Sequence, residues 1–186
     1  MLRTLTEWTG IPGSPYYTNL HFAGDDETEA EAAHAITTAL WEAYAEHVRE
    51  DLTANVLPEV SAVDPVTGDT TATFIEAAEA VPGTAGPNFM PPLVQGLVRL
   101  RTGVYVGGRE IRGKVFLPGT TDPDDVNGIP SAGYLTDVQA VWNALVTDAS
   151  TAGIPLQVWS PTNGQSESVT AVSPWNQWAV LRSRRD

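Results

Sequence analysis

The chain has 186 residues, of which 42% are hydrophobic and 18% charged, and its formal net charge at pH 7 is −13. This composition predicts one globular domain over residues 1–186 and excludes a disordered chain. The absence of cysteine excludes disulfides and thiolate chemistry. No apolar stretch approaches the length of a membrane span, and so acidic a chain does not favour nucleic-acid binding as its main role.

The first half of the chain predicts a short strand at residues 14–23 and then an amphipathic helix at about 27–52. In the helical segment apolar side chains recur every three or four positions, which is the pattern of one helix face. That face consists of Ala33, Ile36, Leu40, Tyr44, Val48 and Leu52. Thr28 and Glu31 have the spacing of a capping box at the start of the helix.

Two hairpins and a loop are predicted after this helix. Residues 55–76 alternate between polar and apolar on both sides of a Pro-Val-Thr-Gly turn, as two antiparallel strands do. Residues 77–92 are rich in Ala, Gly and Pro and predict a loop. A second hairpin is predicted over residues 93–119, with its turn at Gly107 and Gly108.

The rest of the chain predicts a loop at 119–133, a helix at 134–150 and three short strands at 154–160, 168–172 and 175–183. The apolar face of this helix consists of Leu135, Val138, Trp142, Leu145 and Ala149. The expected fold class is therefore α+β, a mainly antiparallel sheet with both helices packed on one face.

The residue types that carry catalysis or bind metals form no recognisable site. His21, His34 and His47 have no metal-ligand spacing. Residues 122–128 lack the alternating ligands and the final Glu of a calcium loop, so at most a weak cation site is expected there. Ser131 lies between glycines, but at the wrong spacing for a nucleophile elbow. We therefore expect no catalytic residue, no cofactor and no structural metal, and predict that the protein is not an enzyme.

Charge is divided unevenly along the chain. Residues 1–92 contain fifteen acidic and two basic residues, whereas residues 93–186 contain eight of each. Opposite charges on the two halves suggest that copies of the chain meet head to tail. The alternative is that the acids form a solvated helix face and the arginines are scattered on strand exteriors.

The cations of the second half define a predicted subunit interface. Five of them lie within the hairpin segment and three lie at the C-terminus, and the alternation of the hairpin predicts that several share one sheet face. Phe116 and Trp8 are expected to be its apolar anchors, Trp8 because it lies near glycines and prolines. The predicted interface consists of Trp8, Arg99, Arg101, Arg109, Arg112, Lys114, Phe116, Arg182, Arg184 and Arg185.

The hairpin segment and the C-terminal "WNQWAVLRSRRD" resemble a group of small virion structural proteins of bacteriophages, among them phages of Actinobacteria. The shared motif is here Gly108, Arg109, Glu110, Arg112, Gly113, Lys114, Phe116, Pro118 and Gly119, with Lys114 at a position where Arg is usual. The resemblance implies a self-assembling virion protein, made in the host cytoplasm, whose partners are its own copies and other virion proteins. It supplies no catalytic residues.

Three functions remain open from the sequence. The favoured one is a tail component (a tube, ring or terminator), because an acidic lumen lets DNA slide past without adhering. The first alternative is a capsid shell, the one case in which nucleic acid is an expected partner. The second is a monomeric binding module. A membrane partner is not expected.

Truncation after Leu181 distinguishes the tail from the capsid. In a tail tube the three terminal arginines pair with acids of the adjacent subunit, so we expect light scattering to show that the truncated chain no longer polymerises. In a capsid the truncated chain still forms shells but releases nucleic acid. The affinity of the full-length chain for nucleic acid would then fall as the salt concentration rises. A plot of log affinity against log salt concentration would have a slope of about −0.9 for each phosphate neutralised.

Overall fold

The computed structural model describes residues 1–10, 16–85, 96–106, 109–117, 132–160 and 165–174. The elements in chain order are β1 (Leu2–Thr9), β2 (Tyr16–Phe22), α1 (Glu27–Tyr44), the short 3-10 helix η1 (Ala45–His47), β3 (Thr53–Val56), β4 (Glu59–Val63), β5 (Thr70–Ile75), β6 (Glu79–Pro82), β7 (Gly96–Val106), β8 (Arg109–Leu117), α2 (Ala132–Thr151), β9 (Leu156–Ser160) and β10 (Gln165–Pro174).

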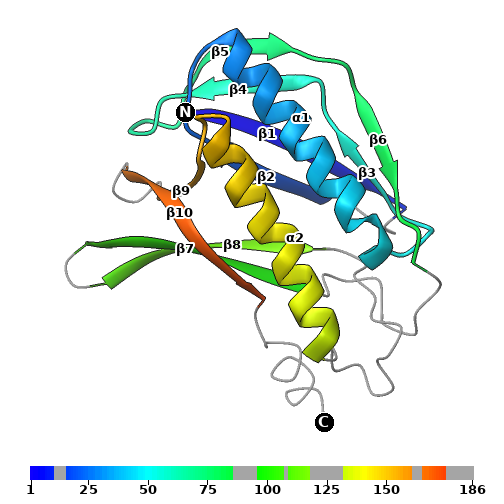
Figure 1. Cartoon of the computed structure of the whole chain (residues 1–186). Helices are drawn as coiled ribbons and strands as arrows, with labels where there is room; N and C mark the ends of the chain where they lie inside the picture. Colours follow the sequence, from blue (N-terminus) through cyan, green and yellow to red (C-terminus); the bar gives the residue numbers. More distant parts are fainter. Residues whose placement is uncertain (11–15, 86–95, 107–108, 118–131, 161–164, 175–186) are drawn as a thin grey trace.

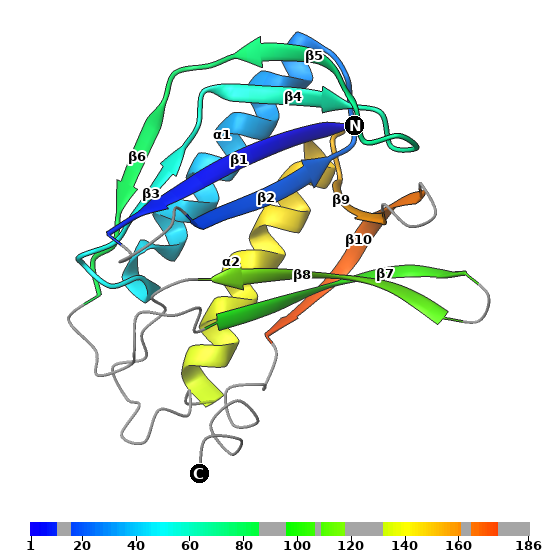
Figure 2. The same ribbon diagram turned by 180° about the vertical axis from the view of Figure 1, so that it is seen from behind.

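The strands form one antiparallel sheet in the order β5-β4-β1-β2-β9-β10-β7-β8, and β3 and β6 branch from β1. Both helices cover the same face of this sheet, as Figure 1 shows from the helical side and Figure 2 from behind. The predicted α+β class, mainly antiparallel with two helices on one face, is confirmed.

The sheet consists of two halves that follow the division of charge. One half, β5-β4-β1-β2, comes from the acidic first part of the chain, and the other, β9-β10-β7-β8, comes from the second part. Only two residue pairs join β2 to β9, namely His21 with Gln157 and Phe22 with Leu156. Because this seam is so short, the helices packed across it must supply much of the connection.

The centre of the first half is β1, a strand that was not predicted from the sequence. It pairs with β2, β3 and β4. Its buried positions alternate as Leu2, Thr4, Thr6 and Trp8, toward the helices. Two of the four are threonines, so the period of two is hidden when only apolar residues are counted.

Trp8 corrects one of the predicted interface residues. Its side chain is only 2% exposed, its ring meets that of Trp41 edge-on at 5.2 Å between centroids, and its Nε1 donates to Thr18 Oγ1 at 2.8 Å. The neighbouring glycine and prolines suggested a surface loop, whereas Trp8 lies near the end of a strand whose alternation directs it into the core. It is therefore a core residue and not an intersubunit anchor.

Trp41 connects both helices to the sheet. From α1 its ring meets Trp8 of β1 edge-on at 5.2 Å between centroids, and Trp142 of α2 edge-on at 6.0 Å. Its Nε1 donates to Thr6 Oγ1 at 2.8 Å. One turn earlier, Thr37 Oγ1 donates to Ala33 O at 2.7 Å and therefore accepts from Thr4 Oγ1 at 2.9 Å. The threonines of β1 thus satisfy polar groups of α1 inside the core, where an unpaired group would be costly.

The ends of α1 differ from the prediction. The capping box is formed by Asp26 and Glu29, and not by Thr28 and Glu31, although the spacing is the same. The helix ends at Tyr44 and does not continue to residue 52.

Tertiary hydrogen bonds explain this early end. Ala85 N donates to Val48 O, and Glu50 N donates to Ala85 O, so the backbone after η1 bonds to a distant segment. Gly83 makes the approach possible, because a Cβ there would lie 2.2 Å from Arg49 O.

The remaining predictions agree with the structure to differing degrees. The hairpin at 55–76 is present as β4 and β5, whereas the predicted loop at 77–92 contains β6. The second helix begins at Ala132, and its predicted face is confirmed at Val138, Trp142, Leu145 and Ala149, which are buried. The strand predicted at 175–183 lies outside the described residues.

Replacement of Trp142 by Ala should lower the free energy of unfolding by about 3–5 kcal/mol, because the side chain is fully buried between the two helices. Urea denaturation followed by circular dichroism measures this. Trp8→Ala should also destabilise the monomer, since Trp8 belongs to the same cluster. The control is Ile75→Ala, at a side chain that is 69% exposed, which should leave stability nearly unchanged. An unaltered midpoint for Trp142→Ala would contradict the assigned core.

Candidate functional site

The β7–β8 hairpin extends beyond the sheet as a two-stranded arm. Thr102 is the last residue of β7 that pairs with β10, yet β7 continues to Val106 and pairs there only with β8. We define the arm as residues 103–106 and 109–112. Figure 1 shows it extending to the left, past β10 and away from both helices. An isolated two-stranded ribbon is only marginally stable in water, so an arm of this kind gains from pairing with something else.

The register of this hairpin brings predicted interface residues together. Arg99 is the partner of Lys114, and Arg101 is the partner of Arg112. Arg109 lies opposite Val106 in the arm. Like charges directly opposite in an antiparallel pair destabilise it. The register contains two such pairs, separated by the pair Leu100–Gly113. Phe116 is the partner of Leu97, at the other end of the hairpin.

The other predicted interface residues do not join this group. Trp8 is in the core, as described above. Arg182, Arg184 and Arg185 lie outside the described residues.

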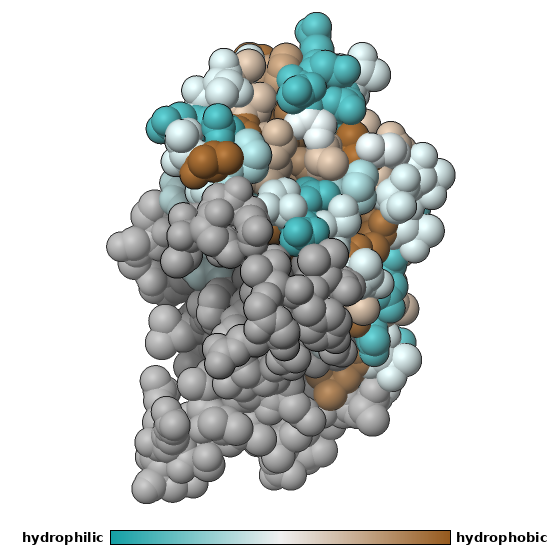
Figure 3. Space-filling view, turned by 90° about the vertical axis from the view of Figure 1, so that its left-hand side faces the viewer, coloured by the Kyte–Doolittle hydropathy of each residue, from teal (hydrophilic) through white to brown (hydrophobic). Residues whose placement is uncertain are grey.

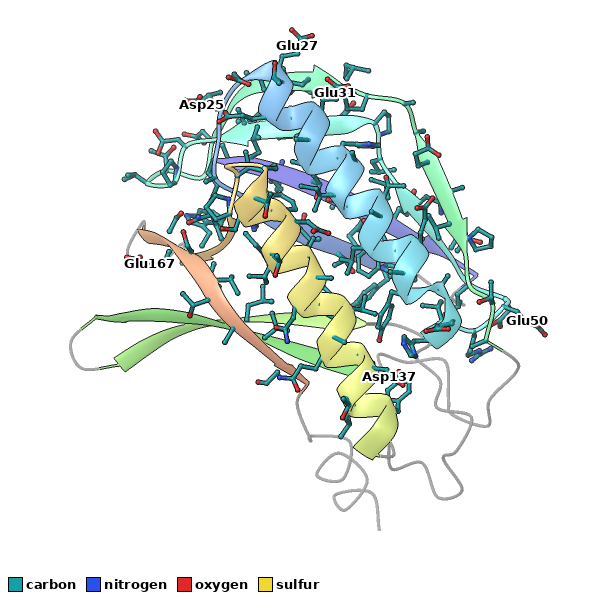
Figure 4. All side chains as sticks on the ribbon, viewed as in Figure 1. Asp25, Glu27, Glu31, Glu50, Asp137 and Glu167 are labelled. Carbon is teal, nitrogen blue, oxygen red and sulfur yellow. The ribbon has the colours of Figure 1, made fainter. Side chains whose placement is uncertain are left out.

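Among the described residues, most acids of the first half form no ion pair. Figure 4 shows Asp25, Glu27 and Glu31 pointing outward around the start of α1, and Glu50 near its far end. In the part of the chain that the structure describes, the ion pairs are Arg49 with Asp51 and Glu46 with His47, the latter only when His47 is protonated. The coloured part of the face in Figure 3 is mixed, with hydrophilic and near-neutral areas interrupted by separate apolar areas.

A second group of polar residues, which was not singled out from the sequence, lies on the sheet face that carries no helix. His21 of β2 pairs with Arg3 of β1, and its ring lies 5.8 Å from that of Trp159. Trp159 Nε1 donates to Pro65 O at 2.8 Å, so the β4–β5 turn folds against β9. Gly68 in this turn has φ +79, and a Cβ there would lie 2.8 Å from the Trp159 ring.

The surroundings of His21 keep its imidazole neutral. Burial lowers its pKa from 6.5 to about 4, and the charges of Arg3 and the N-terminal ammonium act in the same direction. A neutral imidazole flanked by cations is a poor general acid. In the same region, the backbone N–H groups of Val66 and Thr67 donate to the Asp64 carboxylate and lower its pKa. All three residues belong to the β4–β5 turn, so this shift comes from the local turn and not from His21.

The described residues contain no group of three or more His, Asp or Glu side chains that could hold a metal ion. His34 is buried in α1, and His47 packs against Tyr44 and Tyr134 at 5.3 and 5.1 Å between ring centroids.

Among the helices that the structure describes, none is long and apolar enough to cross a membrane.

Comparison of the chain with protein-family models, with curated proteins and with solved structures gave no match.

Acidification should destabilise the protein through His21. The folded-state pKa of about 4 lies below the unfolded value of 6.5, so between these pH values the unfolded chain binds a proton that the folded chain does not. Stability should therefore fall as pH drops from 6.5 to 4, by about 3 kcal/mol in all. His21→Gln removes this titration. Urea unfolding at pH 7, 5.5 and 4 should show a smaller loss for the variant. An equal loss in both proteins would show that His21 is not responsible.

Proposed function

We propose that this protein is a non-enzymatic virion structural protein that assembles with copies of itself, as a component of a bacteriophage tail. The observation that supports the proposal most directly is the β7–β8 hairpin: it carries Arg99, Arg101, Arg109, Arg112 and Lys114 against the single acid Glu110, and it ends in an arm that extends from a body rich in acids. Each chain thus presents a cationic projection and an anionic surface, which are complementary between copies.

Self-assembly would also reduce two unfavourable electrostatic interactions within each chain. The like-charged pairs Arg99–Lys114 and Arg101–Arg112 are relieved if carboxylates of a neighbour approach them. Because the hairpin is cationic, the rest of the chain carries more negative charge than the net −13, and its self-repulsion falls when cations of a neighbour dock on it. Exposed ion pairs contribute only about 0–1 kcal/mol each, so the interface must also bury apolar or backbone surface.

A tail component is favoured over a shell by the sign of the charge. A tube or ring that DNA crosses needs a wall that repels phosphate, and the chain has twenty-three acidic residues against ten basic ones. The resemblance of the hairpin motif to phage virion proteins points to the same class of assembly.

Replacement of Arg109 and Arg112 by Glu should abolish assembly while the monomer stays folded. The reversal changes the charge at two arm positions by four units in total, which turns attraction to an acidic neighbour into repulsion. Light scattering gives the mass of the species and circular dichroism its folding.

Arg109→Lys with Arg112→Lys is the matched control, since it keeps both charges and should retain assembly. A wild-type chain that is monomeric at every accessible concentration would refute self-assembly and favour the binding module. Normal assembly of the Glu variant would show that the arm is not the contact.

A further inference from the structure

The edge strand β5 is open, exposed and uncharged. It is the last strand of the sheet order and, among the described residues, pairs only with β4. Its sequence is Thr-Thr-Ala-Thr-Phe-Ile, and all of its side chains are exposed except that of Phe74, which is partly buried. Ile75 is 69% exposed, and Val66, in the turn before β5, is 71% exposed.

The register shows which backbone groups of β5 are available. Glu76 N donates to Pro58 O, so residues 58 and 76 form a hydrogen-bonded pair. Hydrogen-bonded and non-bonded pairs alternate in an antiparallel ladder, so Phe74 and Ala72 bond to β4 while Thr73 and Ile75 do not. The N–H and C=O groups of Thr73 and Ile75 therefore point to the open edge.

Nothing in β5 itself protects this edge. Proteins usually block an edge strand with Lys, Pro, an inward-pointing charge or a very short length. The six residues of β5 include no charge and no proline, and four of them are β-branched. The bulge between Ala62 and Val63 lies at the start of the pairing and leaves the segment from Ala72 to Ile75 regular. Such an edge is suited to receive another strand.

The charges around β5 select the strand that it receives. Asp69 precedes β5, Glu76 follows it, and Glu59 lies opposite Ile75. No Lys or Arg occurs between Arg49 and Arg99. Pairing of two β5 edges in antiparallel fashion would bring Asp69 of one copy toward Glu76 of the other, so like charges oppose a symmetric contact. A basic strand fits the same edge without this cost.

From these observations we propose that β5 is the docking site for the arm of a second copy, which adds a strand to its open edge. The proposal rests on the self-assembly proposed above and names the surface that the arm binds. The arm supplies backbone beyond the last β10 pair, with Arg109 and Glu110 near its tip and Arg112 at its base, opposite Arg101. The β5 edge supplies outward backbone groups and flanking carboxylates. Added main-chain hydrogen bonds provide the contribution that surface ion pairs alone do not.

This contact is heterologous, because the two surfaces lie at opposite ends of the sheet order. Figures 1 and 2 both place β5 and the arm on different sides of the molecule. Each copy can therefore use its arm and its β5 at the same time. The rotation between copies decides whether the contact closes as a reciprocal pair or a larger ring, or continues as an open filament.

The test is Thr73→Pro, with Thr73→Val as the matched control. Proline removes the Thr73 N–H, which β4 does not use, and leaves the hydrogen bonds of Ala72 and Phe74 in place. We expect Thr73→Pro to be a monomer by light scattering, with a melting temperature within a few degrees of the wild type, and Thr73→Val to assemble. If Thr73→Pro has no melting transition, Ile75→Lys replaces it as the test, because it places a cation at the edge and should also prevent assembly.

Mixing two defective variants decides the pairing. Thr73→Pro keeps an intact arm, and Arg109→Glu with Arg112→Glu keeps an intact β5, so the mixture should form a two-chain species although neither variant assembles alone. A two-chain species formed by the arm variant alone would indicate a β5–β5 contact and overturn the proposal. Full assembly of Thr73→Pro and Ile75→Lys would also overturn it, while leaving self-assembly intact. A monomeric wild type would instead refute the proposed function itself.

Discussion

The structure depends on one contact, the indole of Trp41 held between Trp8 and Trp142 and hydrogen-bonded to Thr6. It joins three elements, β1, α1 and α2, in a molecule in which the two halves of the sheet share only two residue pairs between β2 and β9. The contact fixes α1 on β1 and α2 on α1, and thereby holds the second half of the sheet beside the first. Edge-on aromatic pairs of this kind add stability beyond the area that they bury.

The sequence was sufficient for the fold class and for the second helix, but not for the strand at the centre of the sheet. The face of α2 was predictable because Val138, Trp142, Leu145 and Ala149 are all apolar. The alternation of β1 was not recognisable because Thr4 and Thr6 occupy core positions, where their partners on α1 are known only from the structure. The prediction for Trp8 was wrong for the same reason, since a strand had to be recognised before its inward position could be.

The candidate site shows a similar division. The concentration of cations in the hairpin is visible in the sequence, and so is the acidity of the first half. The sequence does not show which backbone groups near these charges are free to form hydrogen bonds. That β7 continues past its last β10 partner, and that Thr73 and Ile75 present free backbone groups, follows only from the pairing register. In the sequence, the spacing of His21 from the other two histidines shows only that the three do not form a metal site. Its packed environment beside Arg3 and Trp159 depends on a turn more than forty residues away in the chain.

The division of the sheet into two halves has a consequence for synthesis on the ribosome. All strands of the order β5-β4-β1-β2, together with α1, are complete once residue 75 has been made. The first half can therefore form its hydrogen-bonded ladders while the rest of the chain is still being translated. Trp41 then lacks its contact with Trp142 until that residue emerges, about a hundred residues later. The acidic residues concentrated in this early segment would keep such nascent chains apart during that interval.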